Sequence, residues 1–465
     1  MDEKKIIKDN KNDNAELERD YNIGSLCLFV LPSIFTFVFI AIYQIVDGMF
    51  IEKYVGPYAI SAVNLYYPVI SLLLAMGMMM GTGGNAMIVE LIGRGRKEEA
   101  DRRFSQTLIV SIIISVIFAI VGVIFAEPIM KMLGASEANI QYLKFYYMVL
   151  TVCAPAIMLQ TVLGILIIGE GRTVTAGVLI IVGGVLNIVF DYVFMKYFAW
   201  GTKGAAIATI IGYIVPVLYA LYFYSPVGGS KYHFSFVKIE FKKIIKLCYN
   251  GSSEMVSNLA AGVTALFMNW LAYKFYGDIG VSVVSVYLYV QFIVMAIFMG
   301  LTTAVEPLFS YHYGNGNVSM RRKIFKLSVI LTAIFTILVT VFVALFYKNI
   351  AGVFFRQTGE SRKFYELTCK CLVYVIPACV FTGFNIFASG MFTAFSNGAI
   401  SALLSGVRTF VILSACIFGL SALFGEKGLW LSWGVAEALS LVLSIAMLLI
   451  YKRRYFSETL RRNGD

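Results

Sequence analysis

Charged residues are scarce in this chain of 465 residues: they make up 14% of it, against roughly 25% in an average soluble domain. Apolar residues, in contrast, make up 59%. A chain with so little polar surface cannot cover the outside of a water-soluble globule. This composition excludes a secreted enzyme, a disordered scaffold and a cytosolic nucleic-acid-binding protein, and it favours a protein that folds within a lipid bilayer.

Histidine and cysteine are too few, or unsuitably spaced, for metal chemistry. The chain has two histidines, His233 and His312, and its seven cysteines lie mostly inside apolar runs without a CxxC pair. Disulfides, a zinc site and haem are therefore disfavoured. The net charge of +11 comes from Lys and Arg at the ends of apolar runs rather than from a stripe that could follow phosphates. We therefore expect no nucleic-acid partner and no cofactor.

Apolar runs recur along the chain, each near the ~20 residues needed to cross a ~30 Å hydrocarbon core. They lie at roughly 25–49, 58–82, 105–126, 142–168, 174–196, 203–224, 250–273, 281–310, 325–347, 365–393, 400–424 and 428–451. The sequence therefore predicts an all-α membrane protein with twelve transmembrane helices.

The distribution of Lys and Arg predicts the orientation of these helices. If the N-terminus lies inside, the cytosolic segments carry 25 basic residues and the outer loops carry 12, with Arg408 inside a span. Basic residues are enriched in cytosolic loops. We therefore expect a multi-pass protein of the cell (plasma or inner) membrane with both termini in the cytosol.

The second half of the chain repeats the first. The stretch 54–69 (YVGPYAISAVNLYYPV) lies over 275–290 (FYGDIGVSVVSVYLYV) at an offset of 221, and the same offset places Gly93-Arg94-Gly95 over Gly314-Asn315-Gly316. Because both halves start on the same side, we expect two six-helix bundles related by a pseudo-two-fold axis along the membrane normal, with a cleft between them for a transported molecule. The predicted parts are a cytosolic N-terminal tail (1–24), an N-terminal bundle (25–224), a cytosolic linker (225–249), a C-terminal bundle (250–451) and a cytosolic C-terminal tail (452–465).

Ionisable residues within the spans are functional candidates, because each costs roughly 2.5–3.5 kcal/mol in the hydrocarbon on insertion scales. Four polar residues of the first bundle fall at similar depth near the outer side: Asp47, Asn187, Asp191 and Thr209. Asn187 lies one turn before Asp191 and therefore on the same helix face. Two carboxyls, an amide and a hydroxyl in a low-dielectric pocket suit a shared proton or a Na⁺ ion. The alternative is a buried hydrogen-bond network that only fixes helix packing.

The second bundle has its own ionisable residues. Glu254, Glu306 and Arg408 fall towards the cytosolic side. A buried Arg needs a counter-ion, and we expect either Glu306 or Glu254 to supply it. These residues either bind substrate or pair in an inner gate, or they form a static ion network. Glu437 has no evident partner in the sequence, and we include it among the candidates for the substrate or gate role.

Two further patterns favour structural roles. Gly81, Gly83 and Gly84 in MGTGGN lack the Lys-Ser/Thr of a P-loop and the strand that precedes a dinucleotide motif, so they favour close helix packing over nucleotide binding. Pro32 interrupts the first span, and the hydrogen bond that it removes permits bending there. Because Pro32 shares this span with Asp47, bending could be linked to ion binding.

The chain resembles the multidrug and toxic compound extrusion (MATE) transporters, in particular the bacterial branch related to DinF. The resemblance runs from about residue 22 to 451 and rests on the two-bundle repeat and on VDGMFIEKYVG, GRGRKEEA, NIVFDYVF and GAAIAT. It implies twelve helices, a V-shaped cleft and export of bulky, often cationic compounds in exchange for H⁺ or Na⁺. It also maps the family's cation site onto Asp47, Asn187, Asp191 and Thr209, and the family's bending proline onto Pro32.

The leading functional hypothesis is a secondary antiporter, not an enzyme, that works by alternating access of two bundles. Some branches of the family carry a coupling acid deeper in span 7, but here that stretch (257–262, SNLAAG) has no acid beyond Glu254, so we assign coupling to the first bundle alone. The alternative is a lipid-linked oligosaccharide flippase of similar architecture, which would need several basic residues for a pyrophosphate where only Arg408 is available. We expect a monomer whose partners are organic substrates and the bilayer, with H⁺ or Na⁺ as coupling ion and no other metal.

Cysteine labelling tests the predicted topology. In a cysteine-free background, a membrane-impermeant reagent added from outside should label Gly359→Cys and spare Gly228→Cys, because the first lies in a predicted outer loop and the second in the predicted cytosolic linker. The reverse pattern would overturn the topology, and with it the assignment of residues to the inner and outer sides.

Overall fold

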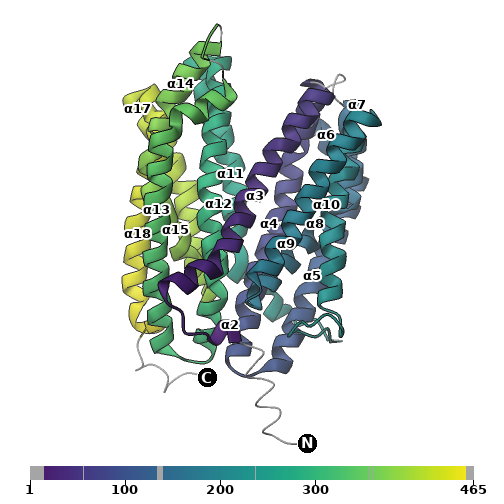
Figure 1. Cartoon of the computed structure of the whole chain (residues 1–465), viewed down its shortest axis with the longest axis vertical. Coiled ribbons are helices and arrows are strands. Elements are labelled where there is room, and N and C mark those ends of the chain that lie inside the picture. The colour runs from purple at the N-terminus through teal and green to yellow at the C-terminus, as the bar shows by residue number, and fades with distance from the viewer. Residues whose placement is uncertain are drawn as a thin grey trace, which may run out of the picture.

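The computed structural model describes residues 15–55, 57–133, 140–235, 237–355, 357–359 and 361–456. This part of the chain is helical and contains no strand. Figure 1 shows two groups of helices side by side, with α2 (Ala15–Glu18) at the lower end of the view. We call the end that carries α2 the terminal end and the opposite end the open end. The parts of the two predicted tails at 1–14 and 457–465 lie outside the described residues.

The first group of helices follows the predicted N-terminal bundle. A π-helical segment, η1, continues the helix that carries Asn187 and Asp191. The elements are α3 (Ile23–Tyr54), α4 (Pro57–Gly93), α5 (Lys97–Ile124), α6 (Ala126–Met132), α7 (Ile140–Val152), α8 (Ala154–Gly169), α9 (Thr173–Tyr192), η1 (Val193–Tyr197) and α10 (Thr202–Phe223).

The second group corresponds to the predicted C-terminal bundle and also contains a π-helical segment, η2, which includes Arg408. The elements are α11 (Phe241–Tyr276), α12 (Asp278–Gly314), α13 (Val318–Phe354), α14 (Ser361–Val373), α15 (Val375–Ala394), α16 (Gly398–Gly406), η2 (Val407–Ile412), α17 (Leu413–Phe424) and α18 (Glu426–Phe456).

The number of membrane spans agrees with the sequence prediction. Among the described residues, 11 spans are long and apolar enough to cross a membrane, and α7 with α8 makes a twelfth that is bent by 53°. Pro155 lies at the start of α8 and has no N–H for the hydrogen-bond ladder, which accounts for a break at this point. The predicted run 365–393 is likewise divided between α14 and α15. The prediction of an all-α membrane protein with twelve spans is confirmed.

The internal repeat is visible in the helix boundaries. Helix α4 ends at Gly93 and α12 ends at Gly314, and both are followed two residues later by a glycine with positive φ, 74° at Gly95 and 72° at Gly316. Only glycine adopts this left-handed conformation without strain, so the motif enforces the same turn in both halves. The offset found in the sequence therefore relates two equivalent helix–turn–helix units.

The two bundles contact each other closely on the side of the terminal end. A Cβ added at Gly93 would lie 2.1 Å from the carbonyl oxygen of Tyr311, and one added at Gly314 would lie 2.0 Å from that of Glu90. These contacts mirror each other across the pseudo-two-fold axis, because each glycine meets the residue three positions before the other. The absence of side chains lets α4 and α12 cross backbone to backbone.

A short N-terminal segment joins both bundles at the terminal end. Leu17 of α2 and Tyr21 are each 1% exposed. The Tyr311 hydroxyl of α12 donates to Glu18, and Lys323 of α13 pairs with Asp20. The segment also packs against the first bundle, since a Cβ at Gly171 would lie 3.1 Å from that of Glu16. These residues therefore bridge the two bundles at the end where α4 and α12 cross.

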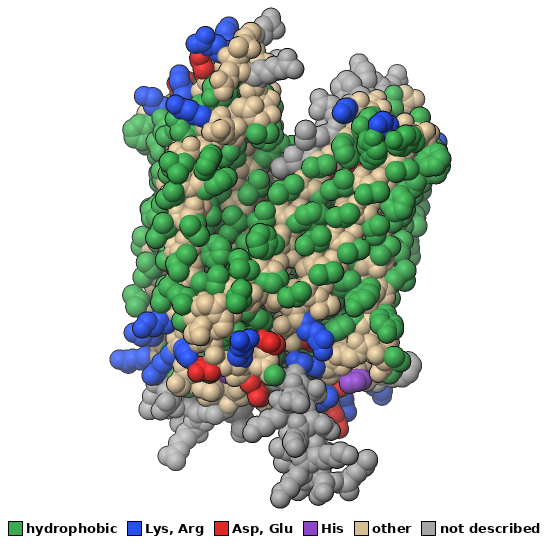
Figure 2. Space-filling view, viewed as in Figure 1, with side chains coloured by type: hydrophobic (Ala, Val, Ile, Leu, Met, Phe, Trp, Pro, Cys, Tyr) green, Lys and Arg blue, Asp and Glu red, His purple; other side chains and the backbone are tan. Residues whose placement is uncertain are grey.

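The surface divides into an apolar belt and two charged ends. In Figure 2 hydrophobic side chains cover the sides of both bundles, while Lys, Arg, Asp and Glu gather at the upper and lower ends of the view. The same view is hollowed between the bundles at the upper, open end. The belt fits the hydrocarbon core, and the two bundles separate towards one side of it.

Two glycines of α11, one at the bundle interface and one away from it, generate a stability prediction. A Cβ at Gly251 of α11 would lie 2.0 Å from the Met79 carbonyl oxygen of α4, whereas one at Gly262, on the same helix, would meet nothing within 4 Å. We expect Gly251→Ala to lower the free energy of unfolding by about 1–3 kcal/mol through overpacking. The control Gly262→Ala should be neutral or slightly stabilising, because alanine favours helix. Thermal unfolding of both purified variants checks this, and equal melting temperatures would contradict it.

Candidate functional site

The structure brings together the four polar residues predicted in the first bundle. Asp47 comes from α3, Asn187 and Asp191 from α9, and Thr209 from α10. The Asn187 amide donates to the Thr209 hydroxyl at 3.5 Å, and the Asp191 carboxyl lies near both Asp47 and Asn187. We call these four residues the acid cluster. Depth along the helices and the helical period were therefore sufficient to group them.

The acid cluster contains carboxyl oxygens without hydrogen-bond partners. Asp191 is fully buried, and neither of its carboxyl oxygens, nor Oδ1 of Asp47, has a partner among the described residues. Two ionised carboxylates are acceptors only and repel each other in a low-dielectric setting. A proton shared between them, or a cation with oxygen ligands, would satisfy these oxygens. The geometry therefore fits a monovalent cation site.

Tyrosines that the sequence did not single out complete the surroundings of the acid cluster. Tyr146 of α7 is 5% exposed, lies close to both carboxyls and contacts the Thr209 hydroxyl. Its ring packs edge-on against Tyr66 of α4, with 5.7 Å between centroids. Tyr213, one turn after Thr209 on α10, is also near Asp47. A tyrosine in an apolar helix carries no distinctive pattern, so the sequence held no signal for these residues.

A π-helical segment begins two residues after Asp191. Helix α9 ends at Tyr192 and η1 occupies Val193–Tyr197. A π-helical turn adds a residue to the helix and disrupts the regular backbone hydrogen-bond ladder, and such turns are frequent at functional sites. The second bundle repeats this feature, because Arg408 lies within η2 in the corresponding span.

The structure corrects the partner predicted for Arg408. Glu437 of α18, rather than Glu306 or Glu254, pairs with it: Oε1 of Glu437 lies 3.0 Å from Nε and 2.9 Å from Nη2 of Arg408. Both side chains are buried. The prediction failed because charge and depth do not reveal which helices are neighbours, and α18 contacts η2 directly.

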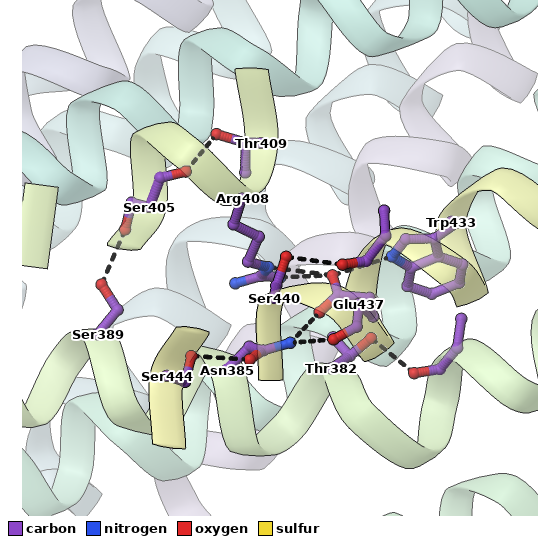
Figure 3. A network of polar contacts seen from close by, with 12 residues as sticks. Thr382, Asn385, Ser389, Ser405, Arg408, Thr409, Trp433, Glu437, Ser440 and Ser444 are labelled. Atoms are coloured by element: carbon purple, nitrogen blue, oxygen red, sulfur yellow. Dashed lines mark hydrogen bonds and ion pairs between the residues drawn. The ribbon is translucent and has the colours of Figure 1, made fainter. Parts of the chain in front are cut away.

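Glu437 is held by donors from three helices (Figure 3). Besides Arg408, its Oε1 accepts from the Trp433 indole at 3.2 Å, and its Oε2 accepts from the Asn385 amide at 2.7 Å. The Asn385 oxygen in turn accepts from the Ser444 hydroxyl at 2.9 Å. Both oxygens of this carboxylate therefore have donors, in contrast to the open oxygens of the acid cluster.

Glu254 and Glu306 lie near each other. Among the described residues neither forms an ion pair with Arg408, although Arg408 is close enough to act on Glu254 electrostatically. Glu306 of α12 is buried against α15, where a Cβ at Gly390 would come within 2.6 Å of its Oε1. The substrate or gate role of Glu254, Glu306, Arg408 and Glu437 stays a prediction.

A chain of buried hydroxyls connects the helices around these glutamates. Ser253 lies 3.2 Å from Thr393, Thr393 lies 2.7 Å from Ser401, and Ser401 lies 3.0 Å from Ser389, which lies 2.8 Å from Ser405. The chain runs from α11, beside Glu254, through α15 to α16, one turn before Arg408. These hydroxyls satisfy one another, which costs less than leaving them unpaired in an apolar interior.

Pro32 lies inside α3, the helix that carries Asp47. The Thr36 hydroxyl donates to the Pro32 carbonyl oxygen at 2.7 Å. Gly177 of α9 faces this segment, since an added Cβ would lie 2.6 Å from the Thr36 hydroxyl oxygen. Figure 1 shows α3 bent in its lower part. The proline and the acid cluster therefore share one helix and one neighbour, α9, as the sequence suggested.

Comparison with known proteins gives consistent matches along the chain. The family model described as MatE matches residues 32–193 and 255–417, one match in each bundle. The multidrug export protein MepA of Staphylococcus saprophyticus is 24% identical over 433 residues, which cover 92% of this chain and 93% of that protein.

Two solved structures share the fold of this chain. A crystal structure of MATE in complex with MaL6 aligns with a TM-score of 0.90 and 21% identity, over 95% of this chain and 99% of that one. An outward-facing conformation of a multidrug resistance MATE family transporter of the MOP superfamily aligns with a TM-score of 0.88 and 22% identity, over 95% of this chain and 98% of that one.

The Arg408–Glu437 pair generates a prediction for stability. Arg408→Gln leaves a buried carboxylate without its counter-ion and should lower the free energy of unfolding by about 3–5 kcal/mol. Adding Glu437→Gln should restore most of this loss, whereas adding Glu254→Gln should not. Denaturation of these variants, together with the Glu437→Gln and Glu254→Gln single variants, measures the coupling. Recovery with Glu254→Gln instead would identify Glu254 as the energetic partner.

Proposed function

Because the chain belongs to the MATE family of membrane transporters, we propose that it exports bulky, often cationic amphipathic compounds in exchange for H⁺ or Na⁺. The observation that carries the proposal is the acid cluster, with its two buried carboxyls and their unpartnered oxygens. The multidrug export named for the staphylococcal relative supports the choice of cargo. The protein would work as a secondary antiporter in the cell membrane, with both termini in the cytosol.

The acid cluster supplies what a coupling site needs. Loading with one proton or one Na⁺ would relieve the repulsion between Asp47 and Asp191, so the cluster would favour the loaded state. Asn187 would orient the pair or ligate Na⁺, and Thr209 would add an oxygen. In this proposal the four side chains would bind the cation directly, without a cofactor. Among the described residues no group of three or more His, Cys, Asp or Glu offers a competing metal site.

Alternating access follows from how the two bundles meet. In the structure they contact at the terminal end through the crossing of α4 and α12, and the surface is hollowed between them at the open end. Rocking about this crossing would expose the cleft to the other side. Binding of the cation to Asp47 would act on α3, in which Pro32 permits bending.

The available energy suits modest concentrative export. Moving one charge inward down 100 mV yields about 2.3 kcal/mol, and a tenfold proton gradient adds about 1.4 kcal/mol. A monomer with one acid cluster could therefore concentrate its cargo without ATP. The flippase alternative is not supported, since Arg408, which a pyrophosphate would require, is already neutralised by Glu437.

Neutral substitutions in the acid cluster test the proposal. Asp47→Asn and Asp191→Asn should each abolish gradient-driven efflux of a cationic dye from proteoliposomes, because an amide cannot carry the proton or the charge that holds the cation. Imposing a pH gradient and a Na⁺ gradient separately identifies the ion. Glu127→Gln, at an exposed acid of α6, is the matched control and should keep coupled efflux.

Insertion and folding of the variants must be verified by size-exclusion chromatography and thermal unfolding. Should either variant keep wild-type efflux from pH 6 to 8 under both gradients, that residue would not be an essential coupling acid. The acid cluster would then be a packing network, and the proposed mechanism would be wrong.

A further inference from the structure

A cavity of about 260 Å³ lies in the second bundle, beside Arg408 and Glu437. Its wall combines aromatic and aliphatic side chains with a few hydroxyls and amides, and it is formed mainly by α11, α12, η2 and α18. Tyr67 of α4 also borders it, so the cavity reaches the first bundle across the cleft. The lining residues used below are Tyr67, Tyr289, Phe292, Trp433, Arg408 and Glu437.

The ion pair offers this cavity hydrogen-bond donors that are not in use. Oε1 of Glu437 already accepts from Nε and Nη2 of Arg408 and from Trp433, and Oε2 accepts from Asn385. The guanidinium has five N–H groups, and Nη1 of Arg408 has no partner among the described residues. Figure 3 shows its free end directed away from Glu437. A ligand therefore meets a guanidinium whose charge is balanced but whose donors are not all used.

The backbone places Arg408 in an unusual segment. It is the second residue of η2, and π-helical turns are frequent at functional sites. Thr409, the next residue, also lines the cavity and is buried. The position of the guanidinium is therefore fixed both by η2 and by its bonds to Glu437, which preorganises it for a ligand.

The chemistry of the wall selects the class of ligand. An organic cation is attracted only weakly to Glu437, whose charge Arg408 already balances, and it meets the positive edge of Arg408. A carboxylate gains a charge-assisted hydrogen bond from Nη1, and an attached aromatic ring can pack against Tyr67, Tyr289 and Phe292. A diphosphate would need more positive charge than one neutralised guanidinium provides.

We propose that this cavity binds the carboxylate-bearing aromatic end of amphipathic acids and zwitterions, with Nη1 of Arg408 as the carboxylate donor. This inference rests on the proposed export function and names a substrate class for it. The volume admits one carboxylate-bearing ring system, but it is below the ~300–1,000 Å³ of pockets for whole drug-sized ligands. The remainder of the compound, including any amine, lies in the cleft beyond Tyr67.

Binding of a matched dye pair to the purified full-length protein tests the inference. Rhodamine B carries a free carboxylate, and its methyl ester is the same dye without that charge. Fluorescence polarisation without any gradient gives both dissociation constants. The wild type should prefer the acid, and Arg408→Gln with Glu437→Gln should reduce the ratio of the two affinities roughly tenfold or more, as expected for loss of a charge-assisted hydrogen bond.

The choice of variants keeps this test decisive. The double variant removes both charges and leaves no unpaired ion, and Arg408→Lys should retain part of the preference because its charge remains. Arg362→Gln with Glu366→Gln removes an exposed Arg–Glu pair and should leave the ratio unchanged. A wild type that prefers the ester, or an unchanged ratio in the folded double variant, would overturn the inference. Preference for the acid without gradient-driven efflux would instead refute the proposed function alone.

Discussion

Every polar group buried in this protein must find a partner inside the protein, because the surrounding hydrocarbon offers none. In the second bundle, two groups of residues meet this constraint: Glu437, both of whose oxygens accept hydrogen bonds, and a chain of hydroxyls that satisfy one another. In the first bundle, carboxyl oxygens of Asp47 and Asp191 have no partner among the described residues, and an ionised carboxyl is costlier to leave open than the neutral hydroxyls and amides that also lack partners in both bundles. The position of these open carboxyls indicates where a cation can bind, and the proposed coupling follows from it.

The fold was largely predictable because the bilayer acts on the sequence in simple ways. Span length follows from membrane thickness, and the repeated GRG and GNG segments mark equivalent turns, since both need glycine with positive φ at Gly95 and Gly316. The breaks were not predictable in the same way. The 53° bend between α7 and α8 depends on Pro155 and on local packing, whereas the hydropathy of the run 142–168 is continuous.

The acid cluster was predictable and the pairing of Arg408 was not. Asn187 and Asp191 are one turn apart, and their depth matches that of Asp47 and Thr209, so helix geometry alone placed them together. The partner of Arg408 depends on which helices are neighbours, and Glu437 reaches it only because α18 packs against η2. Tyr146 escaped notice for a different reason: a tyrosine in an apolar run is common and indicates nothing by itself.

The two bundles share a backbone feature, but the polar side chains beside it differ. Spans 5 and 11 each contain a π-helical segment, η1 directly after Asp191 and η2 around Arg408. Beside η1 are two acids that, in the proposed exchange, would bind and release a cation, whereas beside η2 is an ion pair whose two charges balance each other. Under the proposed exchange, this division has a physical advantage: the cation can bind in one bundle without altering the charge that an organic cargo meets in the other. Coupling between them would then pass through helix contacts between the bundles such as the crossing of α4 and α12, where the two backbones approach each other closely at Gly93 and Gly314.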